Sequence, residues 1–432
     1  MDAASRRLSI LKELFAHVRE RLELDLGFRL WDGSTVPADY SPHALTVSIA
    51  DEGAIAALLR RPKIDTLANL YAAGRIDLLN GTFFDLVARR PKIKTKLFVK
   101  ALDKRLVFDV FRRFLFVPRG GPWPLEAIKT DRPSRHEFAE DKANIHHHYD
   151  ASNEFYALWL DREMVYTCAY FHDWNQSLED AQRNKLDLVC RKLRLKAGET
   201  MLDLGCGWGS LVIHAAQNYG VKAYGVTLAE EQARYAQEKI ERLGLGHLAK
   251  VECRDYATVE GVYDKVSAIC ILEHIGEKNF ETFYGTVHRS LKPDGYFLNQ
   301  SITRPAKKDE QTFRKKNPDY AALTRYVFPG AELDYIGRTT TNLERYGFEV
   351  QDVEGWREHY QLTCKIWHDR LLANRAEAER LVGPVTTRVW LAYLAGVSIA
   401  FERSTALVFQ TLASKRRRGP SGLPPTRADL YR

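Results

Sequence analysis

The stretch MLDLGCGWGS, residues 201–210, decides the fold of this chain. Apolar residues lead into it, Asp203 stands at the turn, and glycines then alternate at Gly205, Gly207 and Gly209. The residues that follow have the pattern of a helix start. A strand, a glycine turn and a helix form the unit with which a doubly wound sheet presents backbone N–H groups to a nucleotide-like ligand. We therefore predict an α/β domain built on a Rossmann-like parallel sheet.

The spacing of these glycines favours one class of ligand. It reads D-x-G-x-G-x-G rather than the G-x-G-x-x-G of dinucleotide sites, and no run of amides long enough for a pyrophosphate follows. Glycine permits backbone angles closed to other residues and lets a ligand approach where a Cβ would block it. The turn therefore favours a nucleoside without phosphates, such as S-adenosylmethionine, over NAD. A glycine turn alone is a weak signal, so the rest of the chain has to decide.

Composition and charge narrow the class of protein. The chain has 432 residues, which is long enough for two or three domains with cores of their own. Its hydrophobic share of 45% and its charged share of 28% are ordinary for a globular protein. The net charge of +8 indicates an anionic partner, either nucleic acid or anionic lipid.

The sequence predicts no signal peptide and no membrane-spanning helix. No apolar core follows a basic start at the N-terminus, and the longest apolar stretch, residues 389–412, is broken by Glu402 and Arg403. Six cysteines are scattered without a C-x-x-C pair, so we expect neither a zinc site nor a disulfide framework. The expected location is the reducing cytoplasm.

We expect three parts along the chain. Residues 1–125 alternate helical and strand patterns and form a smaller α+β domain without a catalytic constellation. A connection that contains glycine and proline begins at Gly120 and leads to a second domain, residues 126–413. Residues 414–432 are basic and rich in proline and glycine, so we expect a disordered tail there.

A basic and aromatic stretch lies near the end of the first domain. Residues 89–119 hold eleven cations and only two anions, with phenylalanines and aliphatic residues between them. Such a stretch can lie in the headgroup region of an anionic membrane as an amphipathic helix. It can equally be a solvated charged face over a packed core, and the sequence leaves both interpretations open.

Three consecutive histidines, His146 to His148, invite a metal interpretation. On a helix, adjacent side chains point about 100° apart, so the three cannot all face one ion. No H-x-x-x-H or H-E-x-x-H motif accompanies them. We therefore expect no metal site.

Polar residues follow the predicted strands of the second domain at the edge where open α/β sheets bind ligands. Thr227 ends the second strand and Gln232 follows on the next helix, where many dinucleotide sites have an acid. Asp255 and Tyr256 end the third strand and suit the edge and face of an adenine. Glu273 comes directly after the fourth strand, which makes it a candidate functional acid.

The remaining elements of the second domain are expected as follows. A fifth strand covers residues 296–302, and a long insertion at residues 303–345 forms a lid or wall. A late strand covers residues 348–353. The region 360–412 is rich in tryptophan, tyrosine and leucine, and we predict that it is helical.

The motifs of the second domain make a specific combination. In chain order over residues 143–412 they are HHYDASNEFYALWLD, YTCAYF, LDLGCGWGS, GVTLAEEQ, CRDY, LEHIG and LKPDG. With them the chain resembles the cyclopropane-fatty-acyl-phospholipid synthases and the related mycolic acid cyclopropane synthases. The resemblance implies a class I methyltransferase domain with helical C-terminal elements. It also implies that S-adenosylmethionine donates a methyl group to the cis double bond of a phospholipid acyl chain.

The resemblance further implies a set of cofactor-binding residues. A glycine turn lines the methionine and ribose, two residues close over the cofactor, an amide binds the ribose, and a pair frames the adenine. In that order these are Gly205 and Gly207, Tyr166 and Thr167, Gln232, and Asp255 and Tyr256. Asp203 and Thr227, which end the first two strands, complete the set that we expect.

The resemblance implies a catalytic base as well. The family holds a bicarbonate ion as the base, cradled by a histidine on the fifth strand and by groups that match Cys168, Glu273, Ile302 and Tyr360. Gln300 stands at the position of that histidine. An amide can still donate a hydrogen bond to bicarbonate, but it cannot carry positive charge as a histidine can. We therefore expect the affinity or the placement of the anion to be altered.

The chemistry explains why Gln300 matters. An isolated alkene is a poor nucleophile, so it must be held in line with the sulfonium methyl in a dry site. Its attack leaves a carbocation, which aromatic faces such as Tyr360 can stabilise, and a base must then remove a proton. Loss of a proton from the new methyl closes a cyclopropane, whereas loss elsewhere gives a methyl-branched or methylene product. Cyclopropanation is the leading hypothesis, and C-methylation is the alternative.

Two other classes of function are open on the sequence. Methylation of a small molecule or of nucleic acid is one, but no zinc finger, recognition helix or RNA-binding signature accompanies the basic charge. A lipid-binding protein with a decayed fold is the other, and the intact glycine turn and Glu273 argue against it. We expect an unsaturated phospholipid in an anionic membrane surface as the partner, no nucleic acid, and peripheral association with the inner face of the membrane. Monomer and homodimer both remain open.

Overall fold

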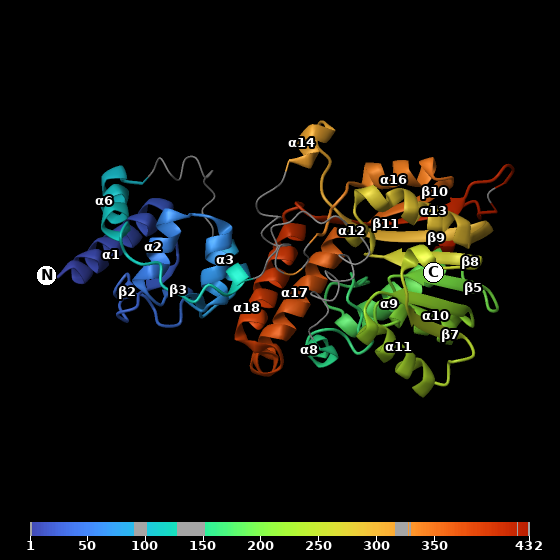
Figure 1. Ribbon diagram of the computed structural model, residues 1–432, viewed down its shortest axis with the longest axis horizontal. Helices are drawn as coiled ribbons and strands as arrows, with labels where there is room; N and C mark the ends of the chain where they lie inside the picture. The colour runs from blue at the N-terminus through green and yellow to red at the C-terminus, as the bar shows by residue number, and fades with distance from the viewer. Residues whose placement is uncertain are drawn as a thin grey trace. The chain divides into compact units, whose positions relative to one another are not determined.

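The computed structural model describes residues 2–89, 102–127, 152–315, 327, 330–420 and 422–430. The chain divides into two compact units (Figure 1). The first comprises Met1–Thr130, Asn317–Ala322 and Gly383–Gly396, and the second comprises Asp131–Lys316, Leu323–Val382 and Val397–Arg432. Each unit thus combines segments that are distant in the sequence, whereas the predicted domains are continuous. The boundary at residue 125 stays a prediction.

The first unit has the small α+β architecture that its sequence pattern predicts. Its elements are α1 (Ala3–Leu22), β1 (Gly27–Arg29), β2 (Thr35–Val36), β3 (Thr46–Ile49), α2 (Glu52–Arg60), α3 (Ile64–Ala72), β4 (Ile76–Leu79), α4 (Phe83–Ala88), α6 (Lys104–Phe114) and the 3₁₀-helix η1 (Pro124–Ala127). The sheet has the order β2-β1-β3-β4, in which only β1 and β3 pair in parallel. Its buried core includes Leu11, Ile49, Leu70 and Phe114.

The second unit is built on a larger mixed sheet. Its elements are α8 (Asn153–Ala157), α9 (Leu178–Lys192), β5 (Thr200–Leu204), α10 (Ser210–Tyr219), β6 (Lys222–Thr227), α11 (Glu230–Arg242), β7 (Ala249–Cys253), η2 (Tyr256–Thr258), β8 (Tyr263–Ile269), α12 (Leu272–Ile275), η3 (Glu277–Asn279), α13 (Phe280–Ser290), β9 (Leu291–Thr303), α14 (Glu310–Arg314), α16 (Ile336–Arg345), β10 (Phe348–Gly355), α17 (Arg357–Ala373), β11 (Leu407–Lys415) and η4 (Ala428–Leu430). Helix α18 (Arg375–Glu402) belongs in part to each unit.

The seven strands of this sheet have the order β10-β11-β9-β8-β5-β6-β7. The strands from β9 to β7 are parallel, and β11 and β10 extend the sheet with antiparallel pairs beside β9. Helices α9, α10 and α11 lie on one face and α13 and α16 on the other, each side closing a buried cluster (Figure 1). The predicted Rossmann-like α/β domain is confirmed.

The glycine turn between β5 and α10 forms where the sequence places it. Gly205, Gly207 and Gly209 have φ angles of 72°, 55° and 77°, a region that L side chains rarely adopt. A Cβ added at Gly209 would lie 2.9 Å from the Cβ of Ala236 on α11. Only glycine therefore lets α10 begin this close to α11.

The C-terminal region differs from the prediction of helix over residues 360–412. Helices α17 and α18 form, but the chain turns after Arg403 and residues 407–415 enter the sheet as β11, between β9 and β10. A strand that is buried on both faces has no polar alternation, so a short apolar run reads the same in a strand and in a helix. The partners of β11 lie far earlier in the chain, where a local pattern cannot reveal them.

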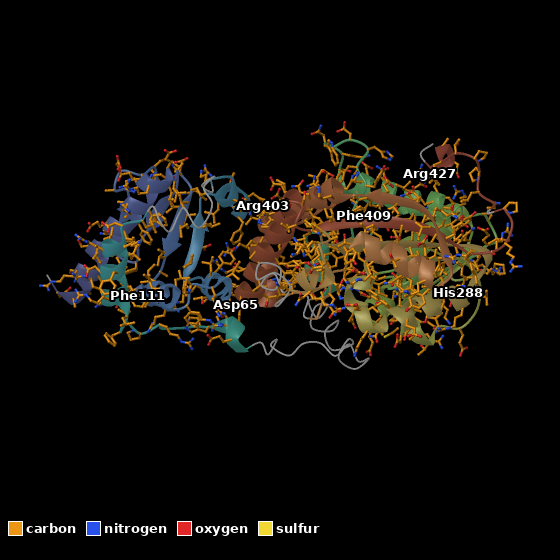
Figure 2. The ribbon with its side chains drawn as sticks, turned by 90° about the horizontal axis from the view of Figure 1, so that it is seen from above. Asp65, Phe111, His288, Arg403, Phe409 and Arg427 are labelled. Atoms are coloured by element: carbon orange, nitrogen blue, oxygen red, sulfur yellow. The ribbon has the colours of Figure 1, made fainter. Side chains whose placement is uncertain are left out.

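The predicted disordered tail also differs from the structure. Arg427, which is labelled in Figure 2, forms an ion pair with Asp352 of β10 at 2.8 Å. Asp429 forms another with Arg194 at 2.9 Å, and Leu430 is buried. Arg427 and Asp429 are thus paired with residues of the second unit, and Leu430 is buried, which gives this segment fixed contacts.

Helix α18 has the length and apolar composition of a membrane span, a test that the core helices of other proteins also pass. Gly383 has a non-helical backbone (φ 80°, ψ 160°) and precedes Pro384, so the segment is two shorter helices. Arg388 is buried and donates a hydrogen bond to Asp77 at 2.9 Å within the first unit. Because charged groups in mid-span are costly in lipid, we interpret α18 as a packed helix.

Candidate active site

A cleft opens at the carboxyl edge of the parallel strands. Residues from the glycine turn, from the ends of β6 and β7, and from the segment after β8 line it. They are Gly205, Gly207, Val226, Thr227, Leu228, Gln232, Arg254, Tyr256, Cys270, Ile271, His274 and Ile275. This edge is where an open α/β sheet binds its ligand.

The glycine turn forms one wall of the cleft. The N–H groups of Gly205 and Cys206 both donate to the carbonyl of Val226, at 2.9 Å each, and hold the turn against β6. A Cβ added at Gly207 would meet nothing within 4 Å, whereas one at Gly205 would lie 3.0 Å from the side chain of Ile271. The space over Gly207 fits a ligand that approaches the backbone closely.

Thr227 and Gln232 form the second wall. The hydroxyl of Thr227 donates to Oε1 of Gln232 at 2.8 Å, and both side chains are buried. This bond occupies the amide oxygen and leaves the amide N–H groups of Gln232 to donate to a ligand oxygen. The pair can thus hold a ribose hydroxyl without the acid that is usual in dinucleotide sites.

Four of the predicted cofactor residues do not line this cleft. Tyr166 lies in a cluster of aromatic rings, and Thr167 accepts a hydrogen bond from the buried Lys185 at 2.9 Å. Asp255 caps η2 through a bond from the N–H of Ala257 at 2.9 Å. Their roles toward the cofactor stay predictions.

Asp203, the fourth of these residues, is buried behind the glycine turn at the end of β5. It accepts a hydrogen bond from the hydroxyl of Ser267 on β8 at 2.6 Å. Burial raises its pKa to about 7, against the lowering effects of Ser267 and Lys185. The carboxyl therefore joins the end of β5 to β8.

Glu273 lies in α12, directly after β8, and is buried. Its Oε1 accepts a hydrogen bond from the N–H of Ile302 on β9. Its Oε2 is buried and has no hydrogen-bond partner among the residues that the structure describes. Burial raises the pKa of this carboxyl from 4.5 to about 7. Glu273 thus offers one unused acceptor in a dry place.

Cys270 links the other predicted catalytic residues. Its N–H donates to the carbonyl of Gln300 at 2.7 Å, and its thiol accepts a long hydrogen bond from Nε2 of Gln300 at 3.7 Å. Burial raises the pKa of the thiol well above its ordinary value, against hydrogen bonds from Gln300 and Tyr360. The backbone of Cys270 has φ 56°, a strained value of the kind that clusters at functional sites.

Cys168 is fully buried beside this group. Its thiol donates to the carbonyl of Ala169 at 3.3 Å, and a weaker contact joins it to the carbonyl of Trp356 at 3.9 Å. Burial raises the pKa of Cys168 well above its ordinary value, and the neighbouring Cys270 adds to this shift. The structure thus brings Cys168, Gln300 and Tyr360 together around Cys270, and it joins Glu273 to Ile302.

Aromatic rings line the approach from α17. Tyr360 stacks on Phe401 with ring centroids 4.7 Å apart and meets the edge of Trp367 at 6.1 Å. Tyr166 contacts Trp367 at 5.2 Å and Trp159 at 5.3 Å. These faces form a continuous apolar wall with the electron density that stabilises positive charge.

Sequence reasoning missed several residues of the cleft. Cys270, Ile271 and His274 flank Glu273, so the edge rule that selected Glu273 could have found them. Arg254 precedes Asp255 in the CRDY motif, but nothing local marks its side chain as a cleft residue. The three histidines at 146–148 lie outside the described residues, within which no cluster of metal-binding side chains occurs.

A sequence model of the mycolic acid cyclopropane synthetase family matches residues 136–411. The chain is 32% identical to a probable fatty acid methyltransferase of Pseudomonas putida, over 96% of this chain and 98% of that protein. It is 33% identical to the cyclopropane-fatty-acyl-phospholipid synthase of Escherichia coli K12, over 62% of this chain and 66% of that protein.

A solved structure is similar to this chain as well. Mycolic acid cyclopropane synthase CmaA1, complexed with SAH and CTAB, matches with a TM-score of 0.60 and 31% identity, over 63% of this chain and 98% of that one.

The burial of Glu273 leads to a pH-dependent effect on stability. The folded state holds the Glu273 proton more tightly than the unfolded state, because its pKa rises from 4.5 to about 7. Between these values the wild-type protein loses stability as pH rises, and a Glu273→Gln variant does not share this loss. We therefore compare the unfolding temperature of the variant with that of wild type at each pH. We expect this difference to favour the variant by several degrees more at pH 8 than at pH 5.

Calorimetric unfolding of both proteins at the two pH values checks this result. An equal difference at both pH values would contradict it. The same variant should bind S-adenosylmethionine with near-normal affinity and turn over slowly, since Glu273 does not line the cofactor cleft.

Proposed function

Because this chain belongs to the mycolic acid cyclopropane synthetase family, we propose that it acts on the cis double bond of unsaturated phospholipid acyl chains, giving cyclopropane fatty acyl groups. Membership of this family establishes an S-adenosylmethionine-dependent methyltransferase that acts on lipid. The choice of a phospholipid acyl chain and of a cyclopropane product is the proposal.

The observation that carries the proposal is the unused acceptor of Glu273. A methyl transfer to a nitrogen or oxygen nucleophile needs no base held in a dry, apolar place, whereas addition to an alkene must end with loss of a proton from carbon. The Oε2 atom of Glu273 is buried without a partner in the described part of the chain, and its pKa is near neutrality. It can accept a hydrogen bond from the hydroxyl group of the base that takes this proton, in a place closed to water.

The described cleft fits S-adenosylmethionine, which supplies a methyl group on a sulfonium centre when bound. Gly205 and Gly207 would line its methionine and ribose, with open space over Gly207 only, Thr227 and Gln232 would hold the ribose hydroxyls, and Tyr256 would face the adenine. Cys270 lines the same cleft and contacts Gln300. The cofactor cleft and the polar group around Cys270 are therefore continuous.

The remaining residues supply the surroundings for the acyl chain. Tyr360 and the rings around it exclude water and stabilise positive charge that develops on carbon. Gln300 and Tyr360 offer hydrogen-bond donors beside the thiol of Cys270. These groups fit a small planar oxyanion, and bicarbonate held there would supply an acceptor for the lost proton.

A second candidate keeps the substrate and cofactor but gives a C-methylated acyl chain, methyl-branched or methylene. Gln300 favours it, because a neutral amide holds an anionic base less firmly than a charged imidazole. A base placed differently removes a different proton, and the proton that leaves determines the product. A relative with similarity along nearly the whole chain is named a fatty acid methyltransferase.

A labelling experiment distinguishes the two products. Vesicles that contain cis-unsaturated phospholipid are incubated with the enzyme and S-adenosylmethionine that carries a trideuterated methyl group. A cyclopropane keeps two deuterium atoms and resists mild hydrogenation, whereas a C-methylated alkene takes up hydrogen. We expect labelled cyclopropane from the wild-type enzyme and little label from Glu273→Gln.

Labelled lipid that consumes hydrogen would favour the second candidate. The absence of label in any lipid, with cofactor binding intact by calorimetry, would contradict both.

We further propose that α6 docks the protein peripherally on the inner, cytoplasmic face of an anionic membrane. Phe108 and Phe111 lie on one stripe of the helix, Leu115 at its C-cap continues this stripe, and Phe108 is 66% exposed (Figure 2, where Phe111 is labelled). Phe116, just beyond the helix, is 89% exposed. The opposite stripe is buried, so these apolar side chains are not core residues of this unit. An apolar stripe flanked by arginines suits an anionic headgroup region.

The docking proposal predicts a loss of vesicle binding. We expect Phe108→Ser with Phe116→Ser to weaken binding to phosphatidylglycerol-containing vesicles about tenfold or more, since each inserted phenylalanine contributes on the order of 1–2 kcal/mol. Sedimentation of the protein with vesicles measures this. Trp174→Ser is the matched control, because Trp174 is 56% exposed on the second unit. Equal binding by the double variant and wild type would contradict the proposal.

A further inference from the structure

Gln300 is held from behind by a second buried glutamine. Gln300 on β9 and Gln410 on β11 are direct partners in the sheet register. Nε2 of Gln410 donates to Oε1 of Gln300 at 2.9 Å, and neither side chain is more than 1% exposed. The sheet therefore places the two side-chain amides end to end and away from water, so that protein neighbours alone determine their orientation.

Lys192, the last residue of α9, stands behind Gln410. Its Nζ lies 3.0 Å from Oε1 of Gln410, and its side chain is 1% exposed. The carboxylates of Glu354 and Asp352 face the same ammonium, Asp352 at 3.8 Å, and the ring of Trp356 covers it at 5.3 Å. These neighbours fix the ammonium at the back of the amide pair.

The ammonium determines which way both amides point. A lysine has donors and no acceptor, so the atom of Gln410 that faces it must be the amide oxygen. The amide nitrogen of Gln410 then faces Gln300, which must accept the hydrogen bond through its own amide oxygen. The NH₂ group of Gln300 is left to point at Cys270, where Nε2 lies 3.7 Å from the thiol. The charge of Lys192 thus orients the amides of Gln410 and Gln300 so that a hydrogen-bond donor faces the reaction site.

We propose that Lys192 and Gln410 are positioning residues that lock the amide of Gln300 with its NH₂ group toward the reaction site. Gln300 then acts as a permanent hydrogen-bond donor beside Cys270, whatever the pH near neutrality. This inference rests on the proposed function for its catalytic consequence only. The orientation of the amide holds independently of the substrate.

The test uses two variants that break this chain of hydrogen bonds and two matched controls. Gln410→Leu removes the bond to Gln300 without a change of charge, and Lys192→Met removes the ammonium. Thr411→Val alters the next buried residue of β11, whose hydroxyl bonds instead to the carbonyl of Asn299. Lys265→Met removes a similarly buried lysine at the opposite end of β8, where it pairs with Glu199.

The first measurement needs no turnover. In a Cys253→Ser background, which removes the exposed cysteine, the rate of Cys270 modification by methyl methanethiosulfonate is followed as a function of pH. A donor beside the thiol favours its thiolate, so we expect Gln410→Leu and Lys192→Met to slow modification at pH 8 roughly tenfold. The controls should match the background protein. Unchanged rates in Gln410→Leu would overturn the proposal.

The second measurement uses turnover of unsaturated phospholipid. We expect kcat to fall about tenfold or more in Gln410→Leu and Lys192→Met with KM for S-adenosylmethionine unchanged, because the cofactor cleft is intact. Lys192→Arg, which keeps only donors at this place, should retain most of kcat. An equal loss of kcat in Lys265→Met would overturn the proposal. Gln410→Leu and Lys192→Met can slow the modification of Cys270 even if the wild-type enzyme turns over no lipid. That combination would uphold the amide orientation and refute the proposed function.

Discussion

The hydrogen bond from the N–H of Cys270 to the carbonyl of Gln300, at 2.7 Å, joins the carboxyl ends of β8 and β9. It draws the chain after β8 across the end of β9 at a left-handed backbone angle. This crossing puts Glu273 against the N–H of Ile302 and the thiol of Cys270 against the amide of Gln300. The cofactor cleft and the polar groups of the site share one wall because of it.

The buried carboxyl groups near the site lower the stability of the folded protein. Asp203 and Glu273 are both buried, and burial raises the pKa of each to about 7. An ionised carboxylate in such a place is costly unless something binds it. Asp203 has Ser267, whereas one oxygen of Glu273 has no partner in the described parts of the chain. The unpartnered oxygen of Glu273 therefore marks the place where we expect proton transfer.

The sequence predicts the part of this arrangement that local pattern encodes. The glycine turn and the parallel strands from β5 to β9 follow from apolar runs and from glycine at positive φ, and Glu273 follows from its place after β8. Strand β11 escaped prediction because its burial on both faces removes the alternation that reveals a strand. Gln410 was therefore missed, and with it the reason that Gln300 is held in one orientation.

Cys270 belongs to the cofactor cleft and to the polar group around Gln300 at once. Modification of Cys270 by methyl methanethiosulfonate in a Cys253→Ser protein, with and without S-adenosylhomocysteine, tests it most directly, since the other four cysteines are buried. We expect saturating S-adenosylhomocysteine to slow the modification of Cys270 at least about tenfold. An unchanged rate, with binding of S-adenosylhomocysteine shown by calorimetry, would contradict it.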